Sequence, residues 1–162
     1  MLGSEKERLF LRRGFTLIEL VVVLSILSIL AAIALPNWGS LLPGVRLNSA
    51  ARQIQSELHR LKSGAVAANN DFQLVFASTQ YSIEKRNDVS WEPTGESRPL
   101  PDGVDIRSTT APRLGFTARG TATPGTGGTI KLCNVHGVGR NVVVSSTGRI
   151  RICRPNKCDE TC

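Results

Sequence analysis

The sequence is poor in the residue types that usually carry catalytic chemistry. Its 162 residues include two histidines, His59 and His136, and no paired acids or metal-ligand spacing accompany either of them. The glycine-rich stretch 120–128 is not a phosphate-binding loop, because no lysine with a following serine or threonine comes after its last glycine. We therefore expect a protein that is not an enzyme and that uses no cofactor or metal.

Cysteine is absent until residue 133. The cysteines then follow within the last 30 residues, as Cys133, Cys153, Cys158 and Cys162. Their spacings lack the C-x-x-C pairs typical of a tetrathiolate zinc site, which favours disulfides, for which three connectivities are open. If Cys133 and Cys153 end two strands that flank a third, they lie about 10 Å apart, too far for a bond. We therefore expect Cys133 to bond with Cys158 or Cys162.

Charged residues are nearly absent between Phe15 and Leu35. These 21 residues contain one charged side chain, Glu19. As a helix they would be about 31 Å long, which matches the hydrocarbon core of a bilayer, so we expect a transmembrane helix over residues 15–35. A carboxylate in such a helix needs a cationic partner, and the run contains none. The partner must come from another subunit or from an amine created by processing.

Two simpler interpretations of this run are a plain transmembrane anchor and a secretory signal peptide. The anchor explains the apolar length but not the acid. The signal peptide explains the basic start and the small residues Ala32-Ile33-Ala34, but its apolar core normally spans about 7–15 residues. In residues 1–14 four bases outnumber two acids, so we expect the amino end on the cytoplasmic side of the membrane.

The residues Arg13-Gly14-Phe15-Thr16-Leu17-Ile18-Glu19 resemble the processing site of type IV pilins and type II secretion pseudopilins. The resemblance implies that residues 1–14 are a leader, removed after Gly14 by a prepilin peptidase that methylates the new amino terminus at Phe15. It also implies that Glu19 neutralises the amine of a neighbouring subunit when helices stack in a filament. The chain would then sit in the bacterial inner membrane, with lipid around residues 15–35 and a periplasmic globular domain, until it is extracted into a filament.

The segment after the apolar run contains two proline and glycine interruptions, which predict a kinked neck over residues 36–44. Beyond it, apolar residues step by four and three and predict one amphipathic helix that packs on a sheet. The stripe consists of Leu47, Ala51, Ile54, Leu58, Leu61, Ala65 and Ala68. The opposite face holds charged residues, Glu57 and Lys62 among them, which we expect to be solvated.

Beyond Asn70 the apolar period changes to two, which predicts short strands between turns rich in glycine, asparagine and aspartate. The predicted strands are 72–77, 81–86, 104–107, 113–117, 129–134, 141–146 and 149–153. The fold class is therefore α+β and pilin-like, with a long amino-terminal helix, transmembrane and then amphipathic, packed on antiparallel sheets. Residues 45–162 form one globular domain, in which the composition of residues 120–128 predicts a flexible loop.

Positive charge is concentrated near the carboxyl end. Residues 104–162 hold nine Lys and Arg against three Asp and Glu, whereas residues 15–103 hold seven against eight. Such a basic third predicts an anionic partner, for example nucleic acid or a membrane surface.

Within this basic third, residues 141–154 predict a strand, a short turn and a returning strand. On the returning strand Arg149 and Arg151 project from one face about 7 Å apart, while the isoleucines beside them face the core. Other bases close in the sequence extend this positive ridge, and they are Arg140, Arg154 and Lys157. A ridge of this kind suits contacts to backbone phosphates.

The stretch from Leu132-Cys133-Asn134 to Gly148-Arg149-Ile150-Arg151 resembles the carboxyl-terminal region of the GspH/FimT family of minor pilins. In FimT-type members a Gly-Arg-x-Arg motif is associated with DNA binding during natural transformation. The resemblance implies a minor pilin or pseudopilin whose partners are the prepilin peptidase, other pilin or pseudopilin subunits and double-stranded DNA. Two alternatives remain open, a structural tip subunit (H-type minor pseudopilin) of a type II secretion system and a surface adhesin.

Overall fold

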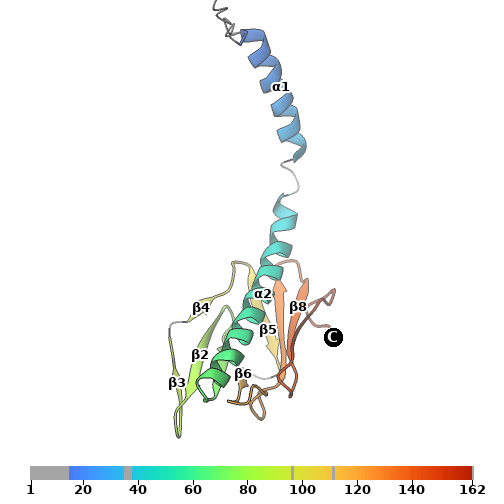
Figure 1. Cartoon of the computed structure of the whole chain (residues 1–162). Coiled ribbons are helices and arrows are strands. Elements are labelled where there is room, and N and C mark those ends of the chain that lie inside the picture. The colour runs from blue at the N-terminus through green and yellow to red at the C-terminus, as the bar shows by residue number, and fades with distance from the viewer. Residues whose placement is uncertain (1–14, 35–37, 96, 111, 162) are drawn as a thin grey trace, which may run out of the picture. The chain divides into compact units, whose positions relative to one another are not determined.

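The computed structural model describes residues 15–34, 38–95, 97–110 and 112–161 (Figure 1). The chain divides into two compact units, Met1–Trp38 and Gly39–Cys162. Gly14, the expected cleavage residue, and Cys162 lie outside the described residues.

In the first unit the structure describes helix α1, Leu17–Ala34. Its large apolar side chains are exposed along its whole length, for example Leu17 at 80% and Ile33 at 74%. Among the described residues, no helix has both the length and the apolar character needed to cross a membrane.

The second helix, α2, covers Trp38–Ala67 and contains Pro43. Residues 38–44, which the sequence predicts as a kinked neck, are therefore helical, and residues 36 and 37 lie outside the described part of the chain. Pro43 stands in the second turn of the helix, where its missing N–H removes one backbone hydrogen bond and the neighbouring turns remain helical.

One stripe of α2 is buried, and it agrees with the predicted stripe from Leu47 to Ala65. Ala68 is exposed, because it follows the end of the helix. The stripe packs on side chains from two sheets, and together they form the core. The sheet residues of this core include Leu74, Tyr81, Leu114, Phe116, Ile130, Leu132, Val142, Val144 and Ile150.

Sheet A is five-stranded and antiparallel, in the order β3-β2-β1-β6 with β4 paired to β2. Its strands are β1 (Phe72–Phe76), β2 (Gln80–Arg86), β3 (Trp91–Pro93), β4 (Arg98–Pro99) and β6 (Arg113–Phe116). The sequence did not predict β3 and β4, which are short and contain proline.

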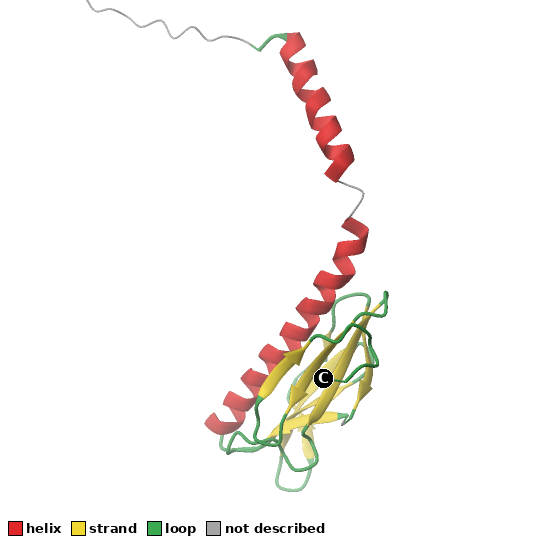
Figure 2. Cartoon of the chain, turned by 90° about the vertical axis from the view of Figure 1, so that its right-hand side faces the viewer, coloured by secondary structure: helices red, strands yellow, loops and turns green. Residues whose placement is uncertain are grey.

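Sheet B is four-stranded and antiparallel, in the order β5-β7-β8-β9. Its strands are β5 (Val104–Thr109), β7 (Gly128–Asn134), β8 (Gly139–Val144) and β9 (Ile150–Cys153). Helix α2 runs along both sheets (Figures 1 and 2), so the expected α+β architecture is confirmed. We call the face of sheet B that points away from α2 the outer face.

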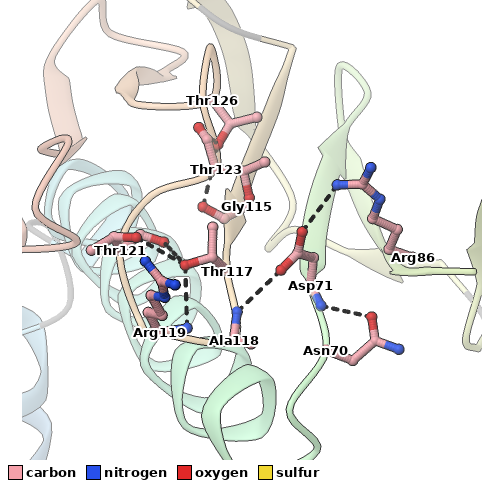
Figure 3. A network of polar contacts seen from close by, with 10 residues as sticks. All are labelled: Asn70, Asp71, Arg86, Gly115, Thr117, Ala118, Arg119, Thr121, Thr123 and Thr126. Atoms are coloured by element: carbon pink, nitrogen blue, oxygen red, sulfur yellow. Dashed lines mark hydrogen bonds and ion pairs between the residues drawn. The ribbon is translucent and has the colours of Figure 1, made fainter. Parts of the chain in front are cut away.

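Hydrogen bonds fix the segment before β7, which the sequence predicts as a flexible loop. The Thr123 N–H donates to the Gly115 carbonyl at 3.0 Å, and the Ala122 N–H donates to the Ser146 carbonyl at 3.2 Å. The Thr126 hydroxyl donates to the Thr123 carbonyl at 2.7 Å (Figure 3). The segment is therefore packed between β6 and the turn that follows β8.

Candidate functional site

A tight turn joins β8 to β9 at one end of sheet B. The Gly148 N–H closes it by donating to the Ser145 carbonyl at 2.9 Å. The Ser145 hydroxyl also accepts a hydrogen bond from the Arg149 N–H at 3.1 Å. The predicted strand, turn and returning strand are therefore present, and β9 is an edge strand of sheet B.

Arg149 and Arg151 lie on the outer face at this edge, and both are exposed. Ile150 between them is 9% exposed and belongs to the core. Both arginines line a hollow of about 300 Å³, together with Val143, Ser145 and Thr147. Neither guanidinium forms an ion pair with a carboxylate of the described residues. The two positive charges are therefore available to an anion from solution.

Gly148, the residue before these arginines, is fixed by the fold. Its φ is +78°, in the left-handed region that favours glycine. A Cβ at this position would stand 2.2 Å from the carbonyl oxygen of Gly120. The turn therefore needs glycine because of its backbone and its close packing.

Lys62 of α2 also reaches this turn. Its Nζ donates to the Gly148 carbonyl at 2.9 Å, across 86 residues of sequence. The sequence predicts a solvated lysine here, but the side chain is half-buried. No local pattern could have revealed the contact, because it depends on how α2 packs against the end of sheet B.

Glu57 is a second departure from the expected solvated helix face. It is 7% exposed, and its carboxylate accepts hydrogen bonds from Arg60 and, at 3.0 Å, from Arg98 of β4. The hydrogen bond with Glu57 raises the pKa of Arg60. Both arginines line a hollow of about 610 Å³ beside α2, which the sequence did not predict.

Arg140 does not belong to the ridge of Arg149 and Arg151. It pairs with Leu132, a core residue, so it lies on the face of sheet B toward α2. Its Nε donates to the Asn48 side-chain oxygen on α2 at 2.8 Å. Burial, and then the nearby charge of Arg154, lower the pKa of Arg140. The expectation that Arg140 extends the ridge is therefore corrected, and the residue links sheet B to α2.

The tail after β9 folds back along sheet B. The Lys131 ammonium donates to the Asp159 carbonyl at 2.9 Å. The Asn141 amide donates to the Glu160 carbonyl, also at 2.9 Å. The tail carries two further predicted ridge residues, Arg154 and Lys157, both exposed.

A disulfide joins this tail to β7. Cys133 is bonded to Cys158, and their Cα atoms are 5.5 Å apart. This bond is one of the two pairings that the sequence predicts for Cys133. Strand β8 lies between the strands of Cys133 and Cys153, as the prediction assumed. Cys153 is disulfide-bonded as well.

At the amino end of α1, Phe15 is 81% exposed, and Thr16 caps the helix. The Thr16 hydroxyl accepts a hydrogen bond from the Glu19 N–H at 3.3 Å. A threonine cap with a glutamate three residues later is the pattern of a capping box, and an acid here also interacts favourably with the helix dipole. The Glu19 carboxylate, in the first turn of α1, therefore has a local role that the sequence did not predict.

Neither histidine lines the hollow of Arg149 and Arg151. His59 is exposed on α2, and His136 is exposed in the turn between β7 and β8. Within the part of the chain that the structure describes, no three His, Cys, Asp or Glu residues lie close enough to hold a metal ion.

Two known sequence families match the chain. The family described as "Type II transport protein GspH" matches residues 50–148. The family described as "Prokaryotic N-terminal methylation motif" matches residues 10–35. A search of curated proteins finds no significant match.

Several solved structures share the fold. The type IV minor pilin FimU of Pseudomonas aeruginosa has a TM-score of 0.55 at 24% identity and covers 69% of this chain and 99% of its own. The minor pseudopilin EpsH of the Vibrio cholerae type 2 secretion system has a TM-score of 0.57 at 16% identity, with the same coverage. GspH of E. coli has a TM-score of 0.57 at 14% identity and covers 68% of this chain and 89% of its own.

Proposed function

We propose that this chain, which belongs to the GspH family of type II transport proteins, is a minor pilin or pseudopilin that binds double-stranded DNA. The family match covers residues 50–148, which hold both sheets up to the Gly148 turn, and the chain shares its fold with FimU and EpsH. The DNA-binding part of the proposal rests on one observation, the pair of exposed arginines without a carboxylate partner at the edge of sheet B.

The amino-terminal motif supports the membrane part of the proposal. In this proposal a prepilin peptidase cuts after Gly14 and methylates Phe15, and the segment 15–35 holds the subunit in the inner membrane. The four bases of the leader keep the amino end cytoplasmic, so the globular domain faces the periplasm. Glu19 then meets the amine of a neighbouring pilin subunit during assembly.

Duplex DNA fits the outer face better than single-stranded DNA does. Proteins that bind single strands stack the bases on aromatic side chains. Strands β5, β7, β8 and β9 contain no aromatic residue. Arginines without a stacking surface suit a phosphate backbone, which gives little sequence preference and a strong dependence on salt.

The test is a titration of the full chain, in detergent micelles, against a fluorescein-labelled DNA duplex at several salt concentrations. Each lost phosphate contact flattens the plot of log affinity against log salt by about 0.9. The double variant Arg149→Gln/Arg151→Gln should therefore bind more weakly, with a slope about 1.8 smaller in magnitude.

A matched control removes the same net charge elsewhere. The double variant Arg52→Gln/Lys85→Gln changes two exposed bases on α2 and β2 and should keep the wild-type slope. The DNA-binding proposal is contradicted if the wild type has no affinity at low salt, or if the Arg149/Arg151 variant binds as tightly as the wild type.

The match to the GspH family of type II transport proteins favours a second candidate, a structural tip subunit of a type II secretion system. Its partners would be other minor pseudopilins, and it would need no phosphate-binding surface. The same titration separates the two candidates. A structural tip subunit should show no salt-dependent affinity for DNA, and the Arg149→Gln/Arg151→Gln variant should give the same result as the wild type.

A further inference from the structure

Three distant segments meet at the turn between β8 and β9. Lys62 of α2 donates to the Gly148 carbonyl at 2.9 Å. A Cβ added to Gly148 would stand 2.2 Å from the Gly120 carbonyl oxygen. A Cβ added to Gly120 would stand 3.2 Å from Lys62 Cε. Residues 62, 120 and 148 are therefore in mutual contact.

Each of these contact points brings a cation to the turn. Lys62 is itself a cation, Arg119 precedes Gly120, and Arg149 follows Gly148. Arg119 is exposed, and neither it nor Lys62 forms an ion pair with a carboxylate of the described residues.

Asp71 is the acid that the structure places beside this loop. Its carboxylate accepts a hydrogen bond from the Ala118 N–H at 3.1 Å and pairs with Arg86 at 3.2 Å (Figure 3). The charge of Asp71 is thus balanced by Arg86, and Lys62, Arg119 and Arg149 form no ion pair with a carboxylate of the described residues.

We infer that Lys62 and Arg119 continue the phosphate-binding surface of Arg149 and Arg151 around the end of sheet B and onto α2. The inference rests on the proposed DNA binding and extends it to two residues outside the Gly-Arg-x-Arg motif. The Lys62 ammonium has three donors and uses one on the Gly148 carbonyl, so the others can meet a phosphate oxygen. Because duplex DNA carries one charge per about 1.7 Å of its axis, cations spread along the turn all find phosphates.

Lys62 also has a purely structural explanation, in which it only ties α2 to the turn. The two explanations differ in the salt dependence of DNA binding. A structural lysine affects stability but not the number of released counterions, whereas a phosphate contact contributes about 0.9 to the slope.

The experiment compares Lys62→Gln, Arg119→Gln and Lys62→Arg in the full chain in detergent micelles, with the same labelled duplex and salt series. Four contacts predict a wild-type slope of about −3.6, and each glutamine variant should reach about −2.7. Lys62→Arg keeps the charge and should keep the wild-type slope. Lys85→Gln on β2 is the control for net charge, and thermal melting of each variant checks the fold.

The results separate this inference from the proposal on which it rests. If the wild type binds DNA but both glutamine variants keep its slope, the surface ends at the motif and the inference is wrong. A wild type without affinity at low salt overturns the DNA-binding function and this inference together. Arg119 is exposed, so its variant stays informative even if Lys62→Gln destabilises the turn.

Discussion

Gly148 determines where the two motif arginines stand. Its left-handed backbone turns the chain back into β9, and its missing side chain makes room for the Gly120 carbonyl. The glycine of the Gly-Arg-x-Arg motif therefore acts through geometry, whereas the arginines act through charge. A substitution at Gly148 would displace Arg149 without removing any positive charge.

A side chain at Gly148 should lower the free energy of unfolding in two ways, through backbone strain and through a steric clash. Gly125 has the same φ of +78°, but a Cβ there meets nothing within 4 Å. Gly125→Ala should lower the free energy of unfolding by about 1 kcal/mol through backbone strain alone. Gly148→Ala adds a collision with backbone and should cost about 1–3 kcal/mol more.

The measurement is urea unfolding of both variants and the wild type in the same micelles. Equal decreases in the free energy of unfolding for Gly148→Ala and Gly125→Ala would show that the backbone at Gly120 moves away without cost. The close packing of the turn would then not contribute to stability.

Among the elements, α2 and the tail after β9 hold sheet B from opposite sides. Helix α2 covers the core face with its buried stripe. The tail lies against the outer face through Lys131, Asn141 and the Cys133–Cys158 disulfide. Because Lys157 precedes Cys158 in this tail, the disulfide also decides where its charge lies, whereas Arg154 directly follows β9 and lies near Arg140.

Removing that disulfide should loosen the tail and lower stability. The double variant Cys133→Ala/Cys158→Ala should lose about 2–4 kcal/mol in the free energy of unfolding, since the bond closes a loop across 25 residues. Urea unfolding measures the loss, and limited proteolysis should cut near Lys157 sooner than in the wild type.

A non-reduced peptide map provides the control. It should link Cys133 to Cys158 in the wild type and, with four cysteines in the sequence, Cys153 to Cys162. A wild type with Cys133 bonded elsewhere, or a variant as stable as the wild type, would contradict the role of this bond.

For the whole molecule, the sequence separates two tasks along the chain. The amino-terminal motif matches residues 10–35, and the GspH family match begins at residue 50. The first region carries the proposed processing and assembly, and the basic surface lies at the carboxyl end of the second and just beyond it, at Arg149 and Arg151. Glu19 has two roles. It stands in the first turn of α1 after the Thr16 cap, and it is the proposed partner of the amine of a neighbouring subunit.

Glu19→Gln separates these two roles. Glutamine keeps the capping pattern at the third position after Thr16 but removes the charge. We expect the variant to be processed to the normal mass and to remain in the membrane, yet to be absent from sheared filament fractions. Assembly at the wild-type level would mean that the charge of Glu19 has no intermolecular function, and Thr16→Val serves as the control that weakens only the cap.

Local patterns predicted much of this protein. The periodicity of four and three from Leu47 to Ala65 identified the buried stripe, because a helix places such residues on one side. Alternation placed Arg149 and Arg151 on the exposed face and Ile150 in the core, because successive residues of a strand point to opposite faces. The order of strands β7, β8 and β9 also made Cys133–Cys158 a predicted pairing.

Other features depend on contacts between segments that are distant in the sequence. Lys62 and Glu57 look like solvated helix residues until sheet B and β4 pack beside α2. Arg140 is close in sequence to the arginine ridge, but the register of β8 turns it toward Asn48. The sequence by itself therefore determined the helices, the strands other than β3 and β4, the buried apolar stripe of α2 and the motif. Only the tertiary structure decided which charges share a surface, because that depends on packing across 86 residues in the case of Lys62 and Gly148.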